Sequence, residues 1–263
     1  MKNFLVLLVA VMLFGACNKS NDDNNSVSGE ATFSVYLTDD PSIYDAVNID
    51  IQSVEVHFST DTDEDTWHTV HMVSPGVHNL LRFTNGKDTI LATERMAAGK
   101  ITQIRLILGS NNSVVVGGVS FPLETPSAQQ SGIKLNVDAQ LTAGIEYKVW
   151  TDFDAARSIV ATGNGKFILK PVIRVYTKAI SGSVSGIVLP VESDAWVYAI
   201  NGSDTLASAK PDETSGNFLI NGLGAGTYSI SVNGSNNYND TTYSNVSVTT
   251  GTVTDIGTVQ LHP

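Results

Sequence analysis

The sequence predicts an all-β protein that contains two antiparallel β-sandwich-like domains. Three observations support this: apolar and polar residues alternate in many short runs, Gly-rich or Asn-rich turns separate these runs, and helical patterns are scarce. The 263 residues suffice for two domains of ordinary size. The formal net charge of −11 argues against nucleic acid, anionic lipid and polyanionic glycans as partners.

Residues 1–16 have the pattern of a signal peptide, and Cys17 is the single cysteine of the sequence. The apolar run over residues 4–16 is shorter than the about 20 residues that span a bilayer. Without a second thiol, neither a disulfide nor a thiolate metal site is expected. The polar residues 18–28 predict a flexible tether.

The tetrapeptide LFGA before Cys17 resembles the lipobox of bacterial lipoproteins. The resemblance implies a diacylglycerol on the Cys17 thiol, cleavage before Cys17 and acylation of the new N-terminus, which together anchor a protein stably. Residues 19–23 resemble the acidic surface-export signal of Bacteroidetes-type lipoproteins, with an ordinary polar tether as the alternative. We therefore expect an outer-membrane, lipid-anchored protein of the cell envelope, with its exterior face as the first candidate location.

The first domain is expected over residues 29–178 and begins with alternation from Phe33 to Leu37. The alternation then changes phase between residues 47–51 and 54–58, which predicts two strands or one strand with a β-bulge near Gln52. Short helical turns are expected at Pro41 and near residues 154–159. The further predicted strands cover residues 101–108, 113–121, 133–137, 145–150 and 167–177.

The second domain is expected over residues 179–263, with strand-like runs spaced as in a small sandwich of five to seven strands. These runs cover residues 183–188, 195–200, 217–223, 226–232 and 245–261. The motifs GNF at 216–218, GL at 222–223 and GTY at 226–228 resemble the carboxypeptidase regulatory-like domain. That resemblance implies a transthyretin-like, carbohydrate-binding-like sandwich that acts as an accessory unit beside enzymes, receptors and adhesins, and it says little about activity.

Residues 29–178 resemble an uncharacterised family of bacterial lipoprotein domains. The motifs that carry the resemblance are SVYLTDDP at 34–41, YDAVNI at 44–49, QSVEV at 52–56, GKITQIRL at 99–106, SGIKL at 131–135 and DFDAARSIV at 152–160. The family has no established activity, so the resemblance implies an envelope location and no reaction.

Asp61, Asp63 and Asp65 lie at alternate positions, as in the start of a calcium-binding loop. Thr66 and Met72 stand where an EF-hand needs glycine and glutamate, so the alternative is a solvated acidic tip of a hairpin. We expect no cofactor and no resident metal, and these three aspartates are the weak calcium candidates.

Asp39, Asp40, Asp152 and Asp154 are candidates for the paired carboxylates of glycoside hydrolysis, which need a sugar between them. The alternatives are contact with a ligand, or structural roles. In the structural roles Asp39 and Asp40 begin a turn, Asp154 caps another, and Asp152 pairs with Arg157.

Trp67 lies beside the acidic tip and is the tryptophan most expected to be exposed for contact with a sugar. Trp150 and Trp196 lie in apolar runs and are expected in the core. The prediction for function is a non-enzymatic binding or adhesion module with carbohydrate or an envelope protein as partner. A structural scaffold of the outer membrane is the alternative, and a glycoside hydrolase is the remote one.

Overall fold

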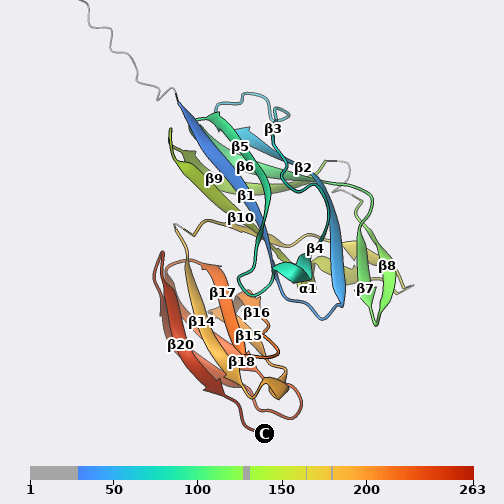
Figure 1. Cartoon of the computed structure of the whole chain (residues 1–263), viewed down its shortest axis with the longest axis vertical. Coiled ribbons are helices and arrows are strands. Elements are labelled where there is room, and N and C mark those ends of the chain that lie inside the picture. The colour runs from blue at the N-terminus through green and yellow to red at the C-terminus, as the bar shows by residue number, and fades with distance from the viewer. Residues whose placement is uncertain (1–28, 127–130, 164, 179) are drawn as a thin grey trace, which may run out of the picture.

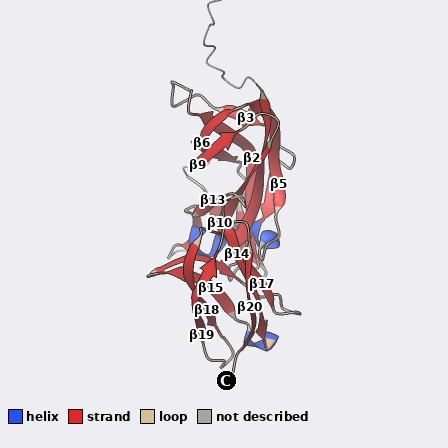
Figure 2. Ribbon diagram, turned by 90° about the vertical axis from the view of Figure 1, so that its left-hand side faces the viewer, coloured by secondary structure: helices blue, strands red, loops and turns tan. Residues whose placement is uncertain are grey.

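The computed structural model describes residues 29–126, 131–163, 165–178 and 180–263. Within these residues the protein is almost entirely β-structure, arranged as two sandwich-like units stacked end to end (Figures 1 and 2). This confirms the predicted all-β, sandwich-like fold class. The described part contains no helix of the length and apolarity that a membrane span requires. The predictions for the signal peptide, Cys17 and the tether concern residues outside the described part.

The first unit has two sheets that enclose one hydrophobic core. The smaller sheet has the order β13 (Ile173–Tyr176), β10 (Glu146–Asp154), β1 (Glu30–Asp40) and β5 (Thr89–Ala97). The larger sheet has the order β11 (Ile159–Ala161), β12 (Phe167–Leu169), β8 (Val119–Glu124), β7 (Ser113–Val116), β2 (Ala46–Phe58), β6 (Gly99–Leu108) and β9 (Ile133–Leu141). Strands β3 (His68–Val70) and β4 (Gly76–Asn79) also pair with β2. Phe33, Val35 and Leu37 point into this core from β1, as their alternation predicts.

The change of phase in the second predicted run is a β-bulge within one strand. Strand β2 is continuous, and its register against β6 shifts between Ile51 and Ser53. The extra residue lets both Ile51 and Val54 face the core, where both are fully buried. Of the two predicted alternatives, the bulge is therefore correct.

Three local predictions are wrong. The run 113–121 is a hairpin of two strands that turns at Gly117 and Gly118, both with positive φ. The run 167–177 divides into β12 and β13 around Pro171, which has no N–H for a ladder. No helical turn forms at Pro41, because β1 pairs with β10 as far as residue 40.

The prediction of a turn near residues 154–159 is confirmed. Helix α1 (Ala155–Ser158) begins after Asp154, whose carboxylate accepts the backbone N–H of Arg157. The other described helical turns are η1 (Leu80–Phe83) and η2 (Val191–Ser193), both 3-10 helices.

The sheets are mostly antiparallel, but three strand pairs are parallel: β1 with β10, β8 with β12, and β14 with β20. Each of these pairs joins segments distant in sequence, so no local turn signal marks it. The expectation of purely antiparallel sheets is corrected at these three pairs.

The second unit packs two sheets around a separate hydrophobic core. One sheet has the order β17 (Asn217–Leu223), β14 (Gly182–Leu189) and β20 (Val253–Gln260). The other has the order β16 (Asp204–Ala209), β15 (Trp196–Asn201), β18 (Gly226–Asn233) and β19 (Thr241–Val248). In Figure 1 the described chain begins at the end of the molecule opposite to its C-terminus, because the two units follow one another along the long axis.

Candidate functional site

The four candidate aspartates converge where the two units meet. We call Asp39, Asp40, Asp152, Asp154 and Arg174 the junction cluster. Parallel pairing of β1 with β10 places Asp40 directly opposite Asp154, and antiparallel pairing of β10 with β13 places Asp152 opposite Arg174. All four aspartates are buried, with exposed fractions of 4–7%. Strand register therefore collects these charges.

Arg174 is the cation of the cluster. Its guanidinium forms an ion pair with Asp152 and lies 3.7 Å from Asp40 Oδ1. The other oxygen of Asp40, Oδ2, accepts the backbone N–H of Ser208 in the second unit at 3.2 Å. Asp40 thus links the ion pair of the first unit to strand β16 of the second.

Two of the aspartates have roles in the local structure. Asp154 caps α1 and pairs with the Arg157 side chain, so the predicted cap is present. The predicted pairing of Asp152 with Arg157 is wrong, because Arg174 holds Asp152. Asp39 Oδ1 accepts the N–H of Ala155 at 3.1 Å, whereas its Oδ2 is buried and has no hydrogen-bond partner among the described residues.

Burial dominates the electrostatics of the junction cluster. It raises the pKa of Asp39 well above the ordinary value, and the neighbouring carboxylates of Asp152 and Asp40 raise it further. Burial also raises the pKa of Asp40 and of Asp152, against the opposing effect of Arg174. The cluster therefore favours protonated carboxyl groups more than an exposed set of aspartates would.

The cavity beside the junction cluster measures about 10 Å³. That volume is about the minimum that one water molecule needs. A glycosidase must place a sugar ring between its two acids, and this cavity is too small for one. The four aspartates converge as the hydrolase hypothesis requires, but they are buried and leave no room for a sugar.

A loop of the first unit also forms hydrogen bonds with the second unit at the junction. The Asn85 side chain donates to the carbonyl of Asn217 at 3.0 Å and accepts the N–H of Leu219 at 2.6 Å. Strand β17 is the edge of its sheet, so this amide satisfies edge groups that would otherwise need water. Next to it, Gly86 has a φ of +80°, which favours glycine, and a Cβ there would lie 2.6 Å from a terminal methyl group of Leu219.

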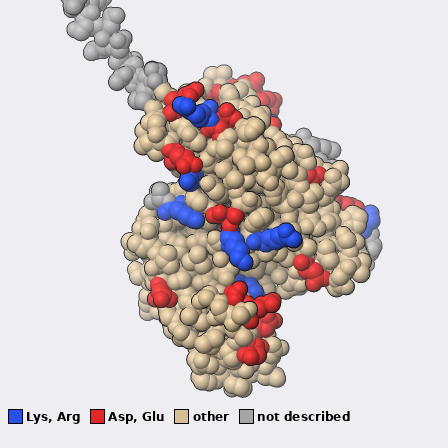
Figure 3. All heavy atoms as spheres, in the orientation of Figure 1, with Lys and Arg blue, Asp and Glu red and all other residues tan. Residues whose placement is uncertain are grey.

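The second close approach is at Gly222. Its φ is +73°, and a Cβ there would lie 2.6 Å from the ring of Tyr176. On the face shown in Figure 3, several Lys and Arg side chains lie at the level where the two units meet. Direct backbone and side-chain contacts therefore join the two units, and the junction is closely packed.

The acidic tip lies at the other end of the first unit. It forms a hairpin, as predicted, since β3 pairs antiparallel with the end of β2. Asp61 accepts the N–H of Phe58 at 2.7 Å, and Asp63 accepts the N–H of Asp65 at 2.9 Å. The described residues contain no group of three or more His, Cys, Asp or Glu side chains arranged to hold a metal ion.

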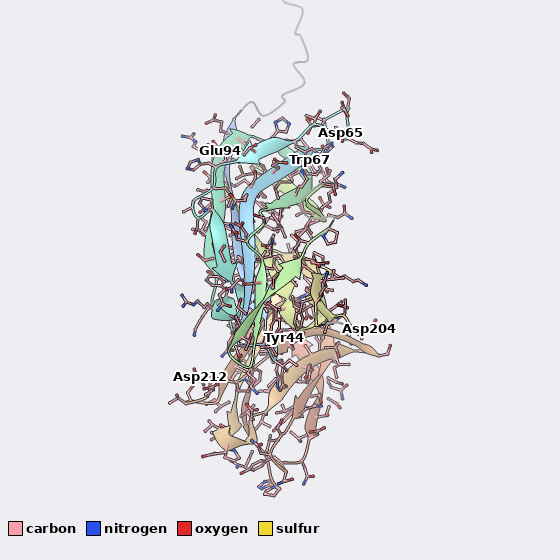
Figure 4. All side chains as sticks on the ribbon, turned by 90° about the vertical axis from the view of Figure 1, so that its right-hand side faces the viewer. Tyr44, Asp65, Trp67, Glu94, Asp204 and Asp212 are labelled. Atoms are coloured by element: carbon pink, nitrogen blue, oxygen red, sulfur yellow. The ribbon has the colours of Figure 1, made fainter. Side chains whose placement is uncertain are left out.

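Trp67 follows the acidic tip and is half-buried, where the sequence predicts an exposed side chain. The guanidinium of Arg105 lies 4.2 Å from the centre of its ring, and the Lys134 ammonium lies 5.4 Å from it. The ring of His57 meets it edge to face, with 5.7 Å between centroids. Figure 4 shows Trp67 and Asp65 at the same end of the molecule, far from Asp204 and Asp212 of the second unit.

A groove of about 310 Å³ opens beside Trp67, and we call it the Trp67 groove. Its lining residues come from β2, the tip, β6 and β9: His57, Glu64, Thr102, Gln103 and Lys134. This volume lies at the lower end of the range for small-molecule sites. The sequence predicts Trp67 as a ligand contact but none of these five residues.

The other two tryptophans have different surroundings. Trp150 is 6% exposed and stacks between Tyr36 and Tyr176, with ring centroids 5.0 Å and 5.9 Å away. Its Nε1–H donates to Asp88 at 2.7 Å. Trp196 is half-buried and stacks on Tyr198. The sequence predicts both tryptophans in the core. Trp150 is buried as predicted, whereas Trp196 is only half-buried.

The fold and these two regions define an all-β protein of two sandwich-like units, with a buried polar cluster at the junction and a larger groove at one end. The chain belongs to the family described as "Domain of unknown function (DUF4382)", whose model matches residues 30–171. Among curated proteins, no match is found.

Solved structures that match this chain include three proteins at low identity. The Bacillus anthracis TIE protein has 10% identity and a TM-score of 0.25, and the match covers 89% of this chain and 35% of that one. The minor pilin GBS52 of Streptococcus agalactiae has 10% identity and a TM-score of 0.22, with 89% and 95% covered. A variant of the shaft pilin SpaA from Lactobacillus rhamnosus GG has 11% identity and a TM-score of 0.23, with 90% and 98% covered.

Proposed function

We propose that this protein is a lipid-anchored binding or adhesion module of the cell envelope and performs no reaction. The anchor is the thioether lipid on Cys17, and residues 18–28 connect it to the first unit. Carbohydrate is the first ligand class, and an envelope protein is the second. The proposal rests on the residues of the N-terminal segment and on the construction of the two units.

The observation that carries the proposal is the closed junction between the two units. Asp40 and Asn85 hydrogen-bond across it, and the approach at Gly222 leaves no space for an additional atom. Two sandwiches joined in this way form an elongated body with the start of the described chain at one end (Figure 1). A lipid at that end would project the second unit away from the membrane, as suits a module that presents a surface.

The same junction weakens the case for a hydrolase. The carboxylates that such an enzyme would use are paired with Arg174 and Arg157 or hydrogen-bonded to backbone N–H groups. A catalytic acid pair needs access to substrate, and these groups border a cavity of about 10 Å³.

The anchor is tested by fractionation of cells that express the full chain or the Cys17→Ala variant. We expect the native chain in the membrane fraction, released by detergent alone, and the variant in the soluble fraction. Equal release of both without detergent would overturn the anchor.

The binding function is tested with a soluble form that begins after Cys17. Both hydrophobic cores are composed of residues from Ala31 onward, so this form keeps the fold. We expect retention on an envelope polysaccharide or glycan array, with heat-unfolded protein as the control. A folded protein that binds no glycan and instead recovers one envelope protein in stoichiometric amount would favour the scaffold alternative.

A further inference from the structure

The Trp67 groove lies on the outer face of three paired strands. The register aligns Glu55, Arg105 and Lys134 in one row across β2, β6 and β9. His57 and Gln103 belong to the next row. Buried residues such as Ile104 alternate with these positions and hold the face against the core. The groove therefore has a rigid sheet as its base.

Trp67 is fixed against this base. Arg105 donates to Glu55 through its Nε at 2.7 Å and also through an Nη, so the guanidinium has a fixed orientation under the indole ring. The ring of His57 is also fixed, with Nδ1 3.2 Å from the hydroxyl of Thr102. A site whose aromatic and polar groups are held before binding loses less entropy when a ligand arrives.

Other polar groups of the groove remain unused. Within the described part of the chain, Lys134 and Glu64 form no ion pair, and both are exposed. Gln103 donates its amide N–H to Asn136 at 3.2 Å, and its amide oxygen accepts no hydrogen bond from a described residue. The groove thus presents the Lys134 ammonium, which lies 5.4 Å from the centre of the Trp67 ring, and two acceptor groups that have no partner among the described residues.

This combination matches the chemistry of a sugar. A pyranose has hydroxyls that both donate and accept hydrogen bonds, so it can pair with the donor and acceptor groups that line the groove. The charges on the wall balance, because Arg105 pairs with Glu55 while Lys134 and Glu64 carry opposite signs. A balanced wall favours a neutral ligand over a phosphate or a carboxylate.

We infer that the Trp67 groove binds one neutral sugar unit of an envelope glycan. The inference rests on the proposed binding function and assigns its ligand site. Trp67 and the start of the described chain lie at the same end of the molecule (Figure 4). With the anchor on Cys17, the groove would face the membrane, so the sugar has two sources: the head group of a neutral glycolipid or a free polysaccharide.

The test measures binding of the soluble form to neutral oligosaccharides and to phosphatidylcholine vesicles with and without a neutral glycolipid. The groove variants are Trp67→Ala and the double variant Lys134→Ala with Gln103→Ala. Lys148→Ala, on the other sheet, is the matched control. Far-UV circular dichroism and the thermal midpoint show which variants are folded. If Trp67→Ala is unfolded, the double variant is used to test the groove.

We expect the groove variants to bind at least about tenfold more weakly than wild type, since each loses contacts worth about one hydrogen bond or more. Lys148→Ala should bind as wild type does. Binding to glycolipid vesicles alone would identify the glycolipid head group as the source of the sugar. Binding to free oligosaccharide would identify a free polysaccharide as the source. Folded groove variants that bind glycans as tightly as wild type would overturn the inference and leave the proposed function standing. A folded wild type that binds neither glycan nor envelope protein would overturn both.

Discussion

The junction cluster and the Trp67 groove contain the same kinds of residue and differ in what surrounds them. Each has an arginine paired with a carboxylate, further charged groups and an aromatic side chain nearby. The junction cluster borders a cavity of about 10 Å³, whereas the groove measures about 310 Å³. The two regions therefore differ in the volume of the space beside their side chains and not in residue type.

The two regions also differ in how their charges are used. At the junction, Arg174 pairs with Asp152 and lies near Asp40, while Asp39 Oδ1 and Asp40 Oδ2 each accept a backbone N–H. In the groove, Arg105 pairs with Glu55, and Lys134 and Glu64 form no ion pair with any described residue. If this contrast is correct, substitutions at the junction should affect stability and those in the groove should affect binding.

The largest effect is expected for Arg174→Ala. This change removes the cation from buried carboxylates, and breaking a buried ion pair costs about 3–5 kcal/mol of unfolding free energy. The control is Arg157→Ala, whose side chain is 50% exposed and whose pair with Asp154 should contribute less than about 1 kcal/mol. Urea denaturation measures both. Equal and small losses for the two variants would mean that the junction cluster does not hold the fold.

A smaller effect is expected for Gly222→Ala. The new Cβ would lie 2.6 Å from the Tyr176 ring, so the junction must open or the ring must move. Gly251→Ala is a matched control, because Gly251 has the same φ of +73° and no atom within 4 Å of the added Cβ. Overpacking predicts that Gly222→Ala loses about 1–3 kcal/mol more than the control in thermal unfolding. The same loss in both would assign the whole effect to backbone conformation.

The pH dependence of stability gives a third test. Burial raises the pKa of Asp39 in the folded state above the unfolded value of about 3.9, so the folded protein binds the proton more tightly. Asp40 and Asp152 have pKa values raised in the same direction. The contribution of these groups to the unfolding free energy is therefore fully present below about pH 4. It should be lost as the pH rises through the folded pKa values.

Asp39→Asn should make this fall less steep. The Asn oxygen can still accept the N–H of Ala155, while the titrating carboxyl is lost. Asp204→Asn, at an exposed position, controls for the loss of one negative charge. Urea denaturation at a series of pH values measures the slope. A wild-type stability that rises over this range would contradict the direction assigned to Asp39.

Sequence patterns predict the parts of this fold that local physics determines. Alternation locates most strands, the change of phase predicts the bulge between Ile51 and Ser53, and Asp154 is recognisable as a helix cap. The pairing of β1 with β10 is different, because no local signal specifies which distant strand lies beside Asp39 and Asp40. These residues therefore resemble the start of a turn, whereas the second unit buries them within a strand.

The groove residues were missed for a related reason. Gln103 and Lys134 occupy polar positions of alternating strands, and such positions are ordinarily solvated. They come together through the register of β6 with β9 and through the position of Trp67, which the chain places over Lys134 after the hairpin tip. The sequence feature that could locate the groove is the tryptophan beside the predicted hairpin tip.

The smallest stability effect is expected in the groove, and it is the sharpest test of the contrast. Lys134 is exposed and forms no ion pair within the described residues, so Lys134→Ala should change the unfolding free energy by less than about 0.5 kcal/mol. Urea denaturation beside Arg174→Ala measures the difference on one scale. A loss above about 1 kcal/mol would show that Lys134 stabilises the fold through Trp67. The groove would then resemble the junction, because its cation would stabilise the fold instead of binding a ligand.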